Sequence, residues 1–465
     1  KIYIKRGKMK KITLALCALC AIIFSSANAE QKIRTVSLWT FASNNCEEWK
    51  RRKDDIDKKF NIDLQIELVA QNRFAKKLYS AMSEGEGKPD IIEWMIENNR
   101  ILSSDPAKSL VIPLNKYLSK SILNNKILSS RLSWVSYSNN IYGLPHDVHP
   151  AVLVYNDTIW KRVGVDLSKI ETWDEFFEES KKLQKLKRNG QQVHFALPFG
   201  YGGLGDSMFM IWQQTEIPIV TKDGKPAFNS PAFIEFQKKW KDWMDSGSMI
   251  MWDWGNFAQF ISDGTYASYI APDWWVSQSD MAAKNGKYRL KVRNLPVYKK
   301  GMKCGSSWGG SFLAIPKGTK DPEKIYKIME YMQYNEAAVT ERFYETGMIP
   351  PVESIYDHYY FKREDPRFNG AKLTQIQIKS GKDLTKVLMA DNFWNYLGDF
   401  SQQFTEYCKE NRISFDEMIE YAQNDAMKRF NAKIDPYAEI TSDIANDEEN
   451  EGEPEEIIEE DVYDE

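Results

Sequence analysis

Tryptophans that stand beside polar or turn-forming residues are the most informative chemical feature of this chain. The 465 residues include fifteen tryptophans, and several of them neighbour Gly, Pro or Asp instead of lying inside apolar runs. A flat aromatic ring can stack on the apolar C–H face of a sugar, while carboxylates and amides bond to its hydroxyl rim. A tryptophan can equally pack in a core, so those at predicted strand ends are the stronger candidates. The pattern predicts a site for a hydroxyl-rich small molecule.

The elements that would position these rings alternate between strand and helix patterns after residue 30. In order, the patterns predict strand 33–41, helix 47–60, strand 62–70, helix 73–82 and strand 90–95. This β-α-β-α-β order is typical of a parallel sheet covered by helices. Ligands bind beyond the carboxyl ends of the strands in such sheets. That rule points to residues 39–45 and 94–99, which include Trp39, Asn44 and Trp94.

The second half of the chain continues the mixed pattern and has no internal repeat. Thr172 is a good N-cap with Glu175 three residues later, which predicts a helix with a capping box over 172–186. Tyr201 follows a predicted strand and precedes two glycines, so its ring could face a cleft. The other predicted elements are strands 194–198, 266–271 and 308–316, helices 231–246 and 321–334, and a mostly helical region 354–430.

Residues 141–160 have the character of a crossing between two lobes. A Tyr-Gly-Leu-Pro turn is followed by polar residues that include Asp147 and His149, and then by an apolar strand over 151–155. Pro145 and Pro150 restrict the backbone on both sides of the polar group. The two polar side chains could therefore bond to a ligand or across a hinge. A His-x-x-His metal pair is the weaker alternative, because the chain contains four histidines.

The chain resembles the family 1 extracellular solute-binding proteins of ABC importers, the group that includes maltose-binding protein. The resemblance extends over nearly the whole chain between the two ends. It rests on four segments that occur in the family's order: 142–156, 172–183, 309–331 and 348–351. It implies an α/β fold of two lobes, the type II periplasmic binding protein, in which each lobe is a mostly parallel sheet flanked by helices. Several hinge crossings would connect the lobes. The implied division is lobe 1 over 30–147 and 308–355, lobe 2 over 148–307 and 356–432, and a tail over 433–465.

The resemblance also implies a set of ligand contacts. Trp94 matches a stacking tryptophan of the family, and Glu97 matches an acidic residue that bonds to sugar hydroxyls. The family's Asp-Lys pair after the first strand is replaced by Ser43 and Asn44. The turn at Pro272 places Trp274 where the family stacks a sugar, beside Asp273. The full set of predicted contacts is Trp39, Asn44, Trp94, Glu97, Asp147, His149, Tyr201, Asp273, Trp274, Trp308 and Trp394.

The two ends of the chain differ from the rest in composition. Lysines around Met9, an apolar run over 12–24 and small residues up to Ala29 predict a cleavable signal peptide over 1–29, with residues 1–8 upstream of the start. Cys17 and Cys20 follow leucines, which argues against a lipoprotein. Residues 443–465 contain thirteen acidic and no basic residues, which predicts a disordered tail. The intervening body is nearly neutral, so nothing indicates a nucleic-acid partner.

These features together favour a periplasmic, monomeric binding protein and not an enzyme. It would capture a carbohydrate, an oligosaccharide above all, by hinge closure and deliver it to an ABC permease, with no metal or cofactor. A second hypothesis keeps the transport role but replaces the sugar with a polyamine or another non-sugar solute. For a polyamine, Glu97, Asp147 and Asp273 would supply the charge. A third is a secreted glycosidase, which needs two carboxylates at a fixed separation. No nucleophile, metalloprotease or phosphate-loop motif supports catalysis.

Overall fold

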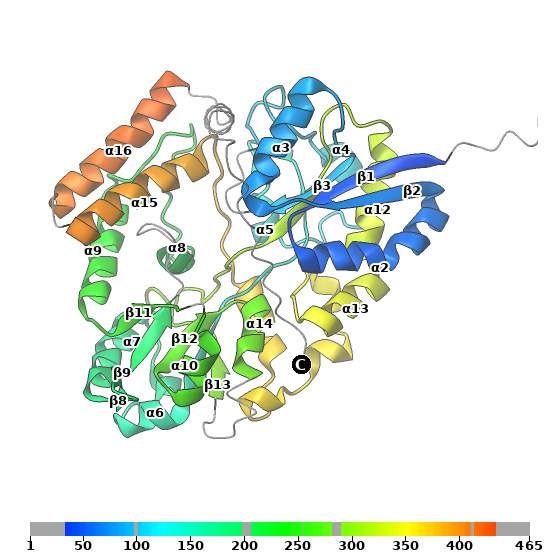
Figure 1. Cartoon of the computed structure of the whole chain (residues 1–465). Coiled ribbons are helices and arrows are strands. Elements are labelled where there is room, and N and C mark those ends of the chain that lie inside the picture. Colours follow the sequence, from blue (N-terminus) through cyan, green and yellow to red (C-terminus); the bar gives the residue numbers. More distant parts are fainter. Residues whose placement is uncertain are drawn as a thin grey trace, which may run out of the picture.

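Two separate five-stranded sheets form the framework of the molecule (Figure 1). The structure is a computed structural model that describes residues 33–96, 101–197, 206–253, 255–280, 290–410 and 413–433. The first sheet has the order β2 (Ile62–Leu68), β1 (Arg34–Thr40), β3 (Ile91–Met95), β14 (Ser311–Ala314) and β6 (Leu144–Pro145). The second has the order β11 (Met249–Met251), β10 (His194–Leu197), β12 (Tyr266–Ala271), β7 (Val152–Asn156) and β13 (Leu290–Arg293).

Both sheets are mixed in strand direction. In the first, β1 is parallel to β2 and β3, whereas β14 is antiparallel to β3 and β6. In the second, β10 is parallel to β11 and β12, whereas β7 is antiparallel to β12 and β13. The predicted two-lobed α/β class is confirmed, and the predicted parallel pairing describes half of each sheet. The antiparallel half arises where the chain enters or leaves a lobe, because such strands are not joined by the right-handed crossover that makes neighbours parallel.

The first sheet buries both faces, and successive residues of its strands alternate between them. Val36, Leu38 and Leu313 face α2 (Ser43–Phe60) and α12 (Pro322–Tyr334), whereas Trp39 and Phe312 belong to the core on the other face. That second face is covered by α3 (Gln71–Glu84) (Figure 1). The core on the α3 side continues without a break into the second sheet's core. Trp39 and Trp94 therefore lie on the side of the first sheet that faces the other lobe.

The second sheet is flanked by helices and packed with aromatic rings. Rings of Trp173, Phe176 and Phe195 meet with centroids 4.7 to 6.3 Å apart. The helices of this part are α6 (Asp157–Arg162), α7 (Trp173–Ser180), α8 (Asp206–Trp212), α9 (Pro231–Asp245), α10 (Phe257–Asp263) and α14 (Leu373–Lys382). The last helices, α15 (Phe393–Glu410) and α16 (Phe415–Ala432), pack side by side as a hairpin (Figure 1).

The chain crosses between the sheets through residues 146–151 and returns through 294–310. The two crossing segments pair with each other: Ala151 N donates to Ser306 O at 2.9 Å, and Trp308 N donates to His149 O at 3.1 Å. A third segment joins them, since Val148 N donates to Ile349 O at 2.8 Å. His149 has a positive φ of 48°, a backbone region in which histidine is more frequent than most residues. The predicted crossing is therefore a three-stranded backbone junction.

Several local predictions are confirmed residue by residue. β12 has the predicted bounds, and the capping box of Thr172 and Glu175 is present at the start of α7. The predicted return strand 308–316 is shorter in the structure, because its first residues belong to the crossing. Helix α2 begins at Ser43, four residues before the prediction.

Among the described residues no helix has the length and hydropathy that a bilayer span requires. The predicted signal peptide and the acidic segment 443–465 lie outside the described residues.

Candidate ligand-binding site

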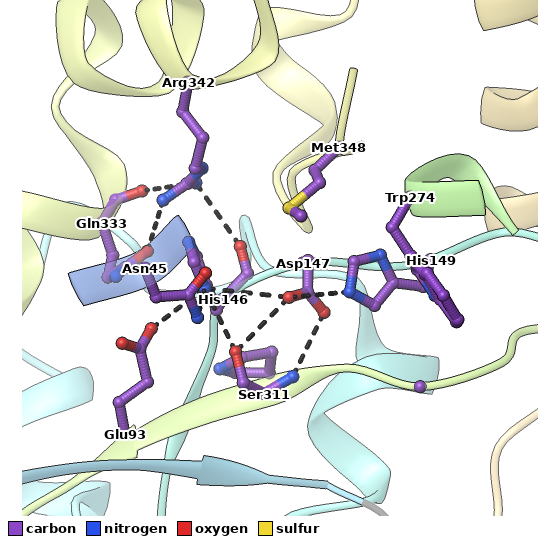
Figure 2. A network of polar contacts seen from close by, with 12 residues as sticks. Asn45, Glu93, His146, Asp147, His149, Trp274, Ser311, Gln333, Arg342 and Met348 are labelled. Atoms are coloured by element: carbon purple, nitrogen blue, oxygen red, sulfur yellow. Dashed lines mark hydrogen bonds and ion pairs between the residues drawn. The ribbon is translucent and has the colours of Figure 1, made fainter. Parts of the chain in front are cut away.

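A buried polar network fills the crossing, and the end of it beside Trp274 is formed by His149 (Figure 2). Its Nδ1 lies 2.6 Å from Asp273 Oδ1, and its Nε2 lies 3.2 Å from Asp147 Oδ2. Asp273 Oδ1 also accepts a hydrogen bond from Trp274 N at 2.8 Å, and Oδ2 accepts one from Ile349 N at 2.7 Å. The Asp273 side chain is 0% exposed. The imidazole therefore bridges the crossing to the second sheet's domain, and both oxygens of Asp273 are engaged.

A guanidinium group completes the surroundings of Asp147. Arg131 lies on α5 (Ser129–Ser133), is fully buried and approaches Asp147 Oδ1 at 3.5 Å. Its nitrogens also donate to Asp147 O, Ser307 Oγ and Gly309 O at 2.9 to 3.1 Å. Gly310 lies so close that a Cβ there would fall 1.7 Å from Arg131 Nη2. Arg131 thus ties the outgoing crossing to the returning one.

His146 forms a second branch of the network, directed into the first lobe. Its Nδ1 lies 3.0 Å from Glu93 Oε1, and its Nε2 lies 3.5 Å from Glu48 Oε2. Arg342 approaches Glu48 Oε1 at 3.4 Å and donates to Gln333 Oε1 at 2.5 Å. With both imidazoles protonated, the two arginines and two histidines balance four acidic residues: Glu48, Glu93, Asp147 and Asp273. A buried set of charges is tolerated only when it is paired in this way.

The surroundings raise the pKa of both histidines. Burial lowers the pKa of His149, but the nearby Asp147 and Asp273 carboxylates outweigh burial and raise it to about 10. Burial and the Arg342 charge lower the pKa of His146, whereas Glu93 and Glu48 raise it, with a net value of about 9. Burial opposes ionisation of Asp147, yet the His149 charge and hydrogen bond hold its pKa well below its usual range.

We expect the stability conferred by this network to be lost at high pH. Because the folded-state pKa values of about 9 and 10 exceed the ordinary value of 6.5, the contribution is complete below about pH 6.5 and declines as the pH rises through 9 and 10. Thermal unfolding measured between pH 7 and pH 10.5 should show a falling Tm. His149→Asn, which suits the positive φ, should have a lower Tm at pH 7 and a shallower decline. Equal slopes in the two proteins would contradict the assignment.

Aromatic rings gather at the end of this network. Trp274 is half-buried, and its ring lies 6.5 Å from His149 and 5.0 Å from Trp308. Its Nε1 donates to Trp308 O at 3.1 Å, so its orientation is fixed. Trp252 stacks on Trp275 at 5.4 Å and meets Trp308 edge-on at 5.3 Å. The structure therefore brings five predicted residues together: Asp147, His149, Asp273, Trp274 and Trp308.

Trp39 and Trp94 form a second group, on the first sheet. Trp94 is 5% exposed and stacks on Phe74 at 4.3 Å, whereas Trp39 is 3% exposed and lies under the Lys77 ammonium group at 4.4 Å. Trp94 Nε1 is buried without a hydrogen-bond partner in the described part of the chain. In this conformation both rings pack as core residues, while Asn44 is exposed in the first turn of α2. Their roles as ligand contacts stay predictions.

The remaining predicted residues are separate from these groups. Trp394 is 8% exposed and packs with Trp134 and Phe209, with centroids 6.1 and 5.8 Å away. Glu97 and Tyr201 lie outside the described residues. A hollow of about 540 Å³ lies where residues 384–388 pass between α5 and the end of α8, and none of the described predicted contacts lines it. No group of three or more His, Cys, Asp or Glu side chains in the described ranges is arranged to hold a metal ion.

The sequence analysis did not identify the charged side chains that balance the charges of the crossing. Arg131 and Arg342 lie on helices and have no distinguishing pattern around them. Glu93 carried a usable signal, because it is a carboxyl group within the apolar strand β3, and a buried carboxylate needs a partner. That signal indicated a buried polar group but gave no indication of which cation it would meet.

Two α/β lobes, a junction of paired crossing segments and a group of aromatic rings beside it define a two-lobed binding protein. The sequence family of bacterial extracellular solute-binding proteins matches residues 52–369. The chain belongs to this family, which consists of binding proteins and not enzymes.

Sequence relatives and solved structures agree with this class. The arabinooligosaccharide-binding protein of Bacillus subtilis is 25% identical over 410 residues, which cover 83% of this chain and 92% of that protein. The protein of the same name from Halalkalibacterium halodurans is 22% identical and covers 83% and 87%. The sugar-binding protein MalE of Xanthomonas citri has a TM-score of 0.68 at 16% identity, covering 90% of this chain and all of that one. The ABC transporter associated binding protein of B. animalis subsp. lactis, solved with β-1,6-galactobiose, has a TM-score of 0.63 at 20% identity, with 86% and 97% covered.

Proposed function

We propose that this protein captures an oligosaccharide between its two lobes and delivers it to the permease of an ABC importer, with arabinooligosaccharides as the first candidates. The observation that carries the proposal is the group of tryptophans beside the crossing, in which Trp274 is half-buried and held in one orientation. An aromatic ring fixed in this way offers a large contact area to a sugar face at low entropic cost. The two arabinooligosaccharide-binding relatives support the choice of ligand class.

In the proposed mechanism, lobe 1 comprises residues 30–147 and 308–355, and lobe 2 comprises 148–307 and 356–432. Ligand contacts made by both lobes would exist only in the closed form, so binding would shift the population toward it. The paired crossing segments would serve as the hinge. Asp147, His149 and Asp273 would hold the crossing and orient Trp274, and Trp94 would act from lobe 1. We further propose that the protein works as a monomer in the periplasm after removal of residues 1–29.

The charge arrangement favours a neutral sugar over a polyamine. A dication would need carboxylates that are free to face it. Asp147 is already paired with His149 and Arg131, and both Asp273 oxygens are engaged by His149, Trp274 and Ile349. The described part of the site therefore offers a cation little net negative charge, whereas a sugar needs only ring faces and hydrogen bonds.

A thermal-shift comparison of ligand classes tests the proposal. We expect arabinooligosaccharides to raise the Tm of the purified protein, because a ligand at 100 times its Kd adds about 2.7 kcal/mol to the stability of the folded state. Maltooligosaccharides, galactobiose, spermidine and amino acids provide the comparison. If only another class of sugar raises the Tm, that sugar replaces arabinooligosaccharides as the proposed ligand. A rise with spermidine alone would overturn the carbohydrate assignment while leaving the transport role.

A further inference from the structure

A cluster of four aromatic side chains lies on the protein surface, where residue 344 meets residues 358–360. Tyr344, on α13 (Glu336–Thr346), is 66% exposed, and Tyr359, on η5 (Tyr359–Lys362), is 61% exposed. His358 and Tyr360 beside them are half-buried. Large exposed side chains that gather in one place on a soluble protein mark interaction sites more often than single exposed ones. We call these four residues the tyrosine platform.

The rings of the platform form a continuous surface. Tyr359 stacks on Tyr360 with centroids 4.1 Å apart, His358 stacks on Tyr360 at 5.1 Å, and Tyr344 meets Tyr360 edge-on at 5.8 Å. They border a shallow hollow of about 710 Å³. No aliphatic side chain larger than that of an alanine lines the hollow within the described part of the chain. The core of a protein-docking surface is usually depleted in Glu and Ala, whereas Glu336, Glu341 and Ala337 line this hollow.

The backbone beneath the platform is fixed by contacts that do not involve the exposed rings. Glu341 and Glu345 of α13 form ion pairs with Arg52 and Arg51 of α2. On the inner side, Phe343 stacks on Phe361 with centroids 4.2 Å apart. The attachment of α13 and η5 to the rest of the protein therefore does not require Tyr344 or Tyr359. Their exposure is not explained by packing.

Polar groups at the rim complete the chemistry of a sugar site. Glu336 and Thr340 also line the hollow, and neither side chain has a partner among the described residues. A carboxylate and a hydroxyl can accept and donate hydrogen bonds with sugar hydroxyls, while the rings stack on C–H faces. We propose that the tyrosine platform is a second carbohydrate site, outside the cleft, which takes a segment of a neutral polysaccharide chain. An open surface suits an internal segment of a long chain, whereas a closing cleft suits a short oligosaccharide.

Native gel electrophoresis in the presence of a soluble polymer tests this site. The probes are linear arabinan and soluble starch, run in parallel gels with the intact protein. We expect at least one polymer to retard the wild type. We expect the double variant Tyr344→Ala/Tyr359→Ala to have an apparent affinity for that polymer at least about tenfold lower. Tyr421→Ala, which removes a 40% exposed tyrosine on α16, is the matched control and should migrate like the wild type. Both substitutions leave core contacts intact, and the Tm verifies folding.

The cleft variant Trp274→Ala separates this site from the proposed function. Retardation that survives Trp274→Ala and disappears in the double tyrosine variant supports the platform, even if no oligosaccharide stabilises the protein in the thermal-shift comparison. The proposal is overturned if neither polymer retards the wild type. Retardation lost in Trp274→Ala but kept in the double variant also overturns it. The double variant could instead be retarded by the polymer like the wild type but no longer stimulate ATP hydrolysis by the permease. That result would assign the surface to permease docking and overturn the carbohydrate site.

Discussion

Replacing Trp274 with alanine is expected to weaken binding of the preferred oligosaccharide by roughly 30-fold, which corresponds to about 2 kcal/mol for the loss of a central aromatic anchor. The ring is half-buried beside the crossing, and its orientation is fixed by the bond from its Nε1 to Trp308 O. The variant loses the surface on which a sugar would stack. Isothermal titration calorimetry with the oligosaccharide that gives the largest thermal shift measures the effect.

A conservative replacement separates stacking from folding. Trp274→Phe retains a flat ring, so we expect a smaller loss of affinity than in Trp274→Ala, with a similar Tm for both variants. If Trp274→Ala binds as tightly as the wild type and melts normally, Trp274 does not belong to the ligand site. If both variants lose binding and melt at a much lower temperature, the ring is a core residue whose effect on binding is indirect.

Asp147→Ala is expected to lower the free energy of unfolding by about 3 to 5 kcal/mol, the usual cost of removing one partner from a buried ion pair. Asp147 lies between the Arg131 guanidinium group at 3.5 Å and His149 Nε2 at 3.2 Å. Without it, a fully buried arginine and an imidazole each lose a counter-charge in a region of low dielectric constant. Urea unfolding followed by circular dichroism measures the change.

A pair of similar chemistry on the surface provides the control. Glu353 lies 3.2 Å from Lys382, and the two side chains are 51% and 45% exposed. Glu353→Ala should therefore leave the unfolding curve nearly unchanged, because exposed ion pairs contribute little. An effect of Asp147→Ala as small as that of Glu353→Ala would mean that the crossing network does not stabilise the fold.

Local sequence patterns were sufficient for most elements and for the position of the crossing. The short strand β12, which ends before Pro272, and the capping box of α7 depend on neighbours within a few positions, so their signal is visible in the chain itself. The same holds for the Pro145 and Pro150 pair, which predicted an extended crossing, and for the motifs that indicated the solute-binding family. The start of α2 was placed too late because Ser43 and the residues after it carry no strong helix signal.

The polar network could not be predicted because its partners are distant in sequence. His149 and Asp273 are 124 residues apart, and Arg131 and Ser307 are 176 residues apart. Nothing in the local pattern of either member encodes such a pair, since each side chain could satisfy its hydrogen bonds with a ligand, water or another residue. The sequence therefore left open whether Asp147 and His149 would bond to a ligand or across the hinge.

The sequence by itself determined the α/β elements, the crossing at 141–160, the family and the presence of aromatic residues suited to a sugar. Only the tertiary structure decided which polar groups are already engaged. Asp147, His149 and Asp273 satisfy one another and the returning chain, whereas Trp274 keeps a partly open ring beside them. The physical reason is that backbone preferences act over a few residues, but the pairing of buried charges depends on how distant segments pack, and burial makes each unpaired charge too costly to leave.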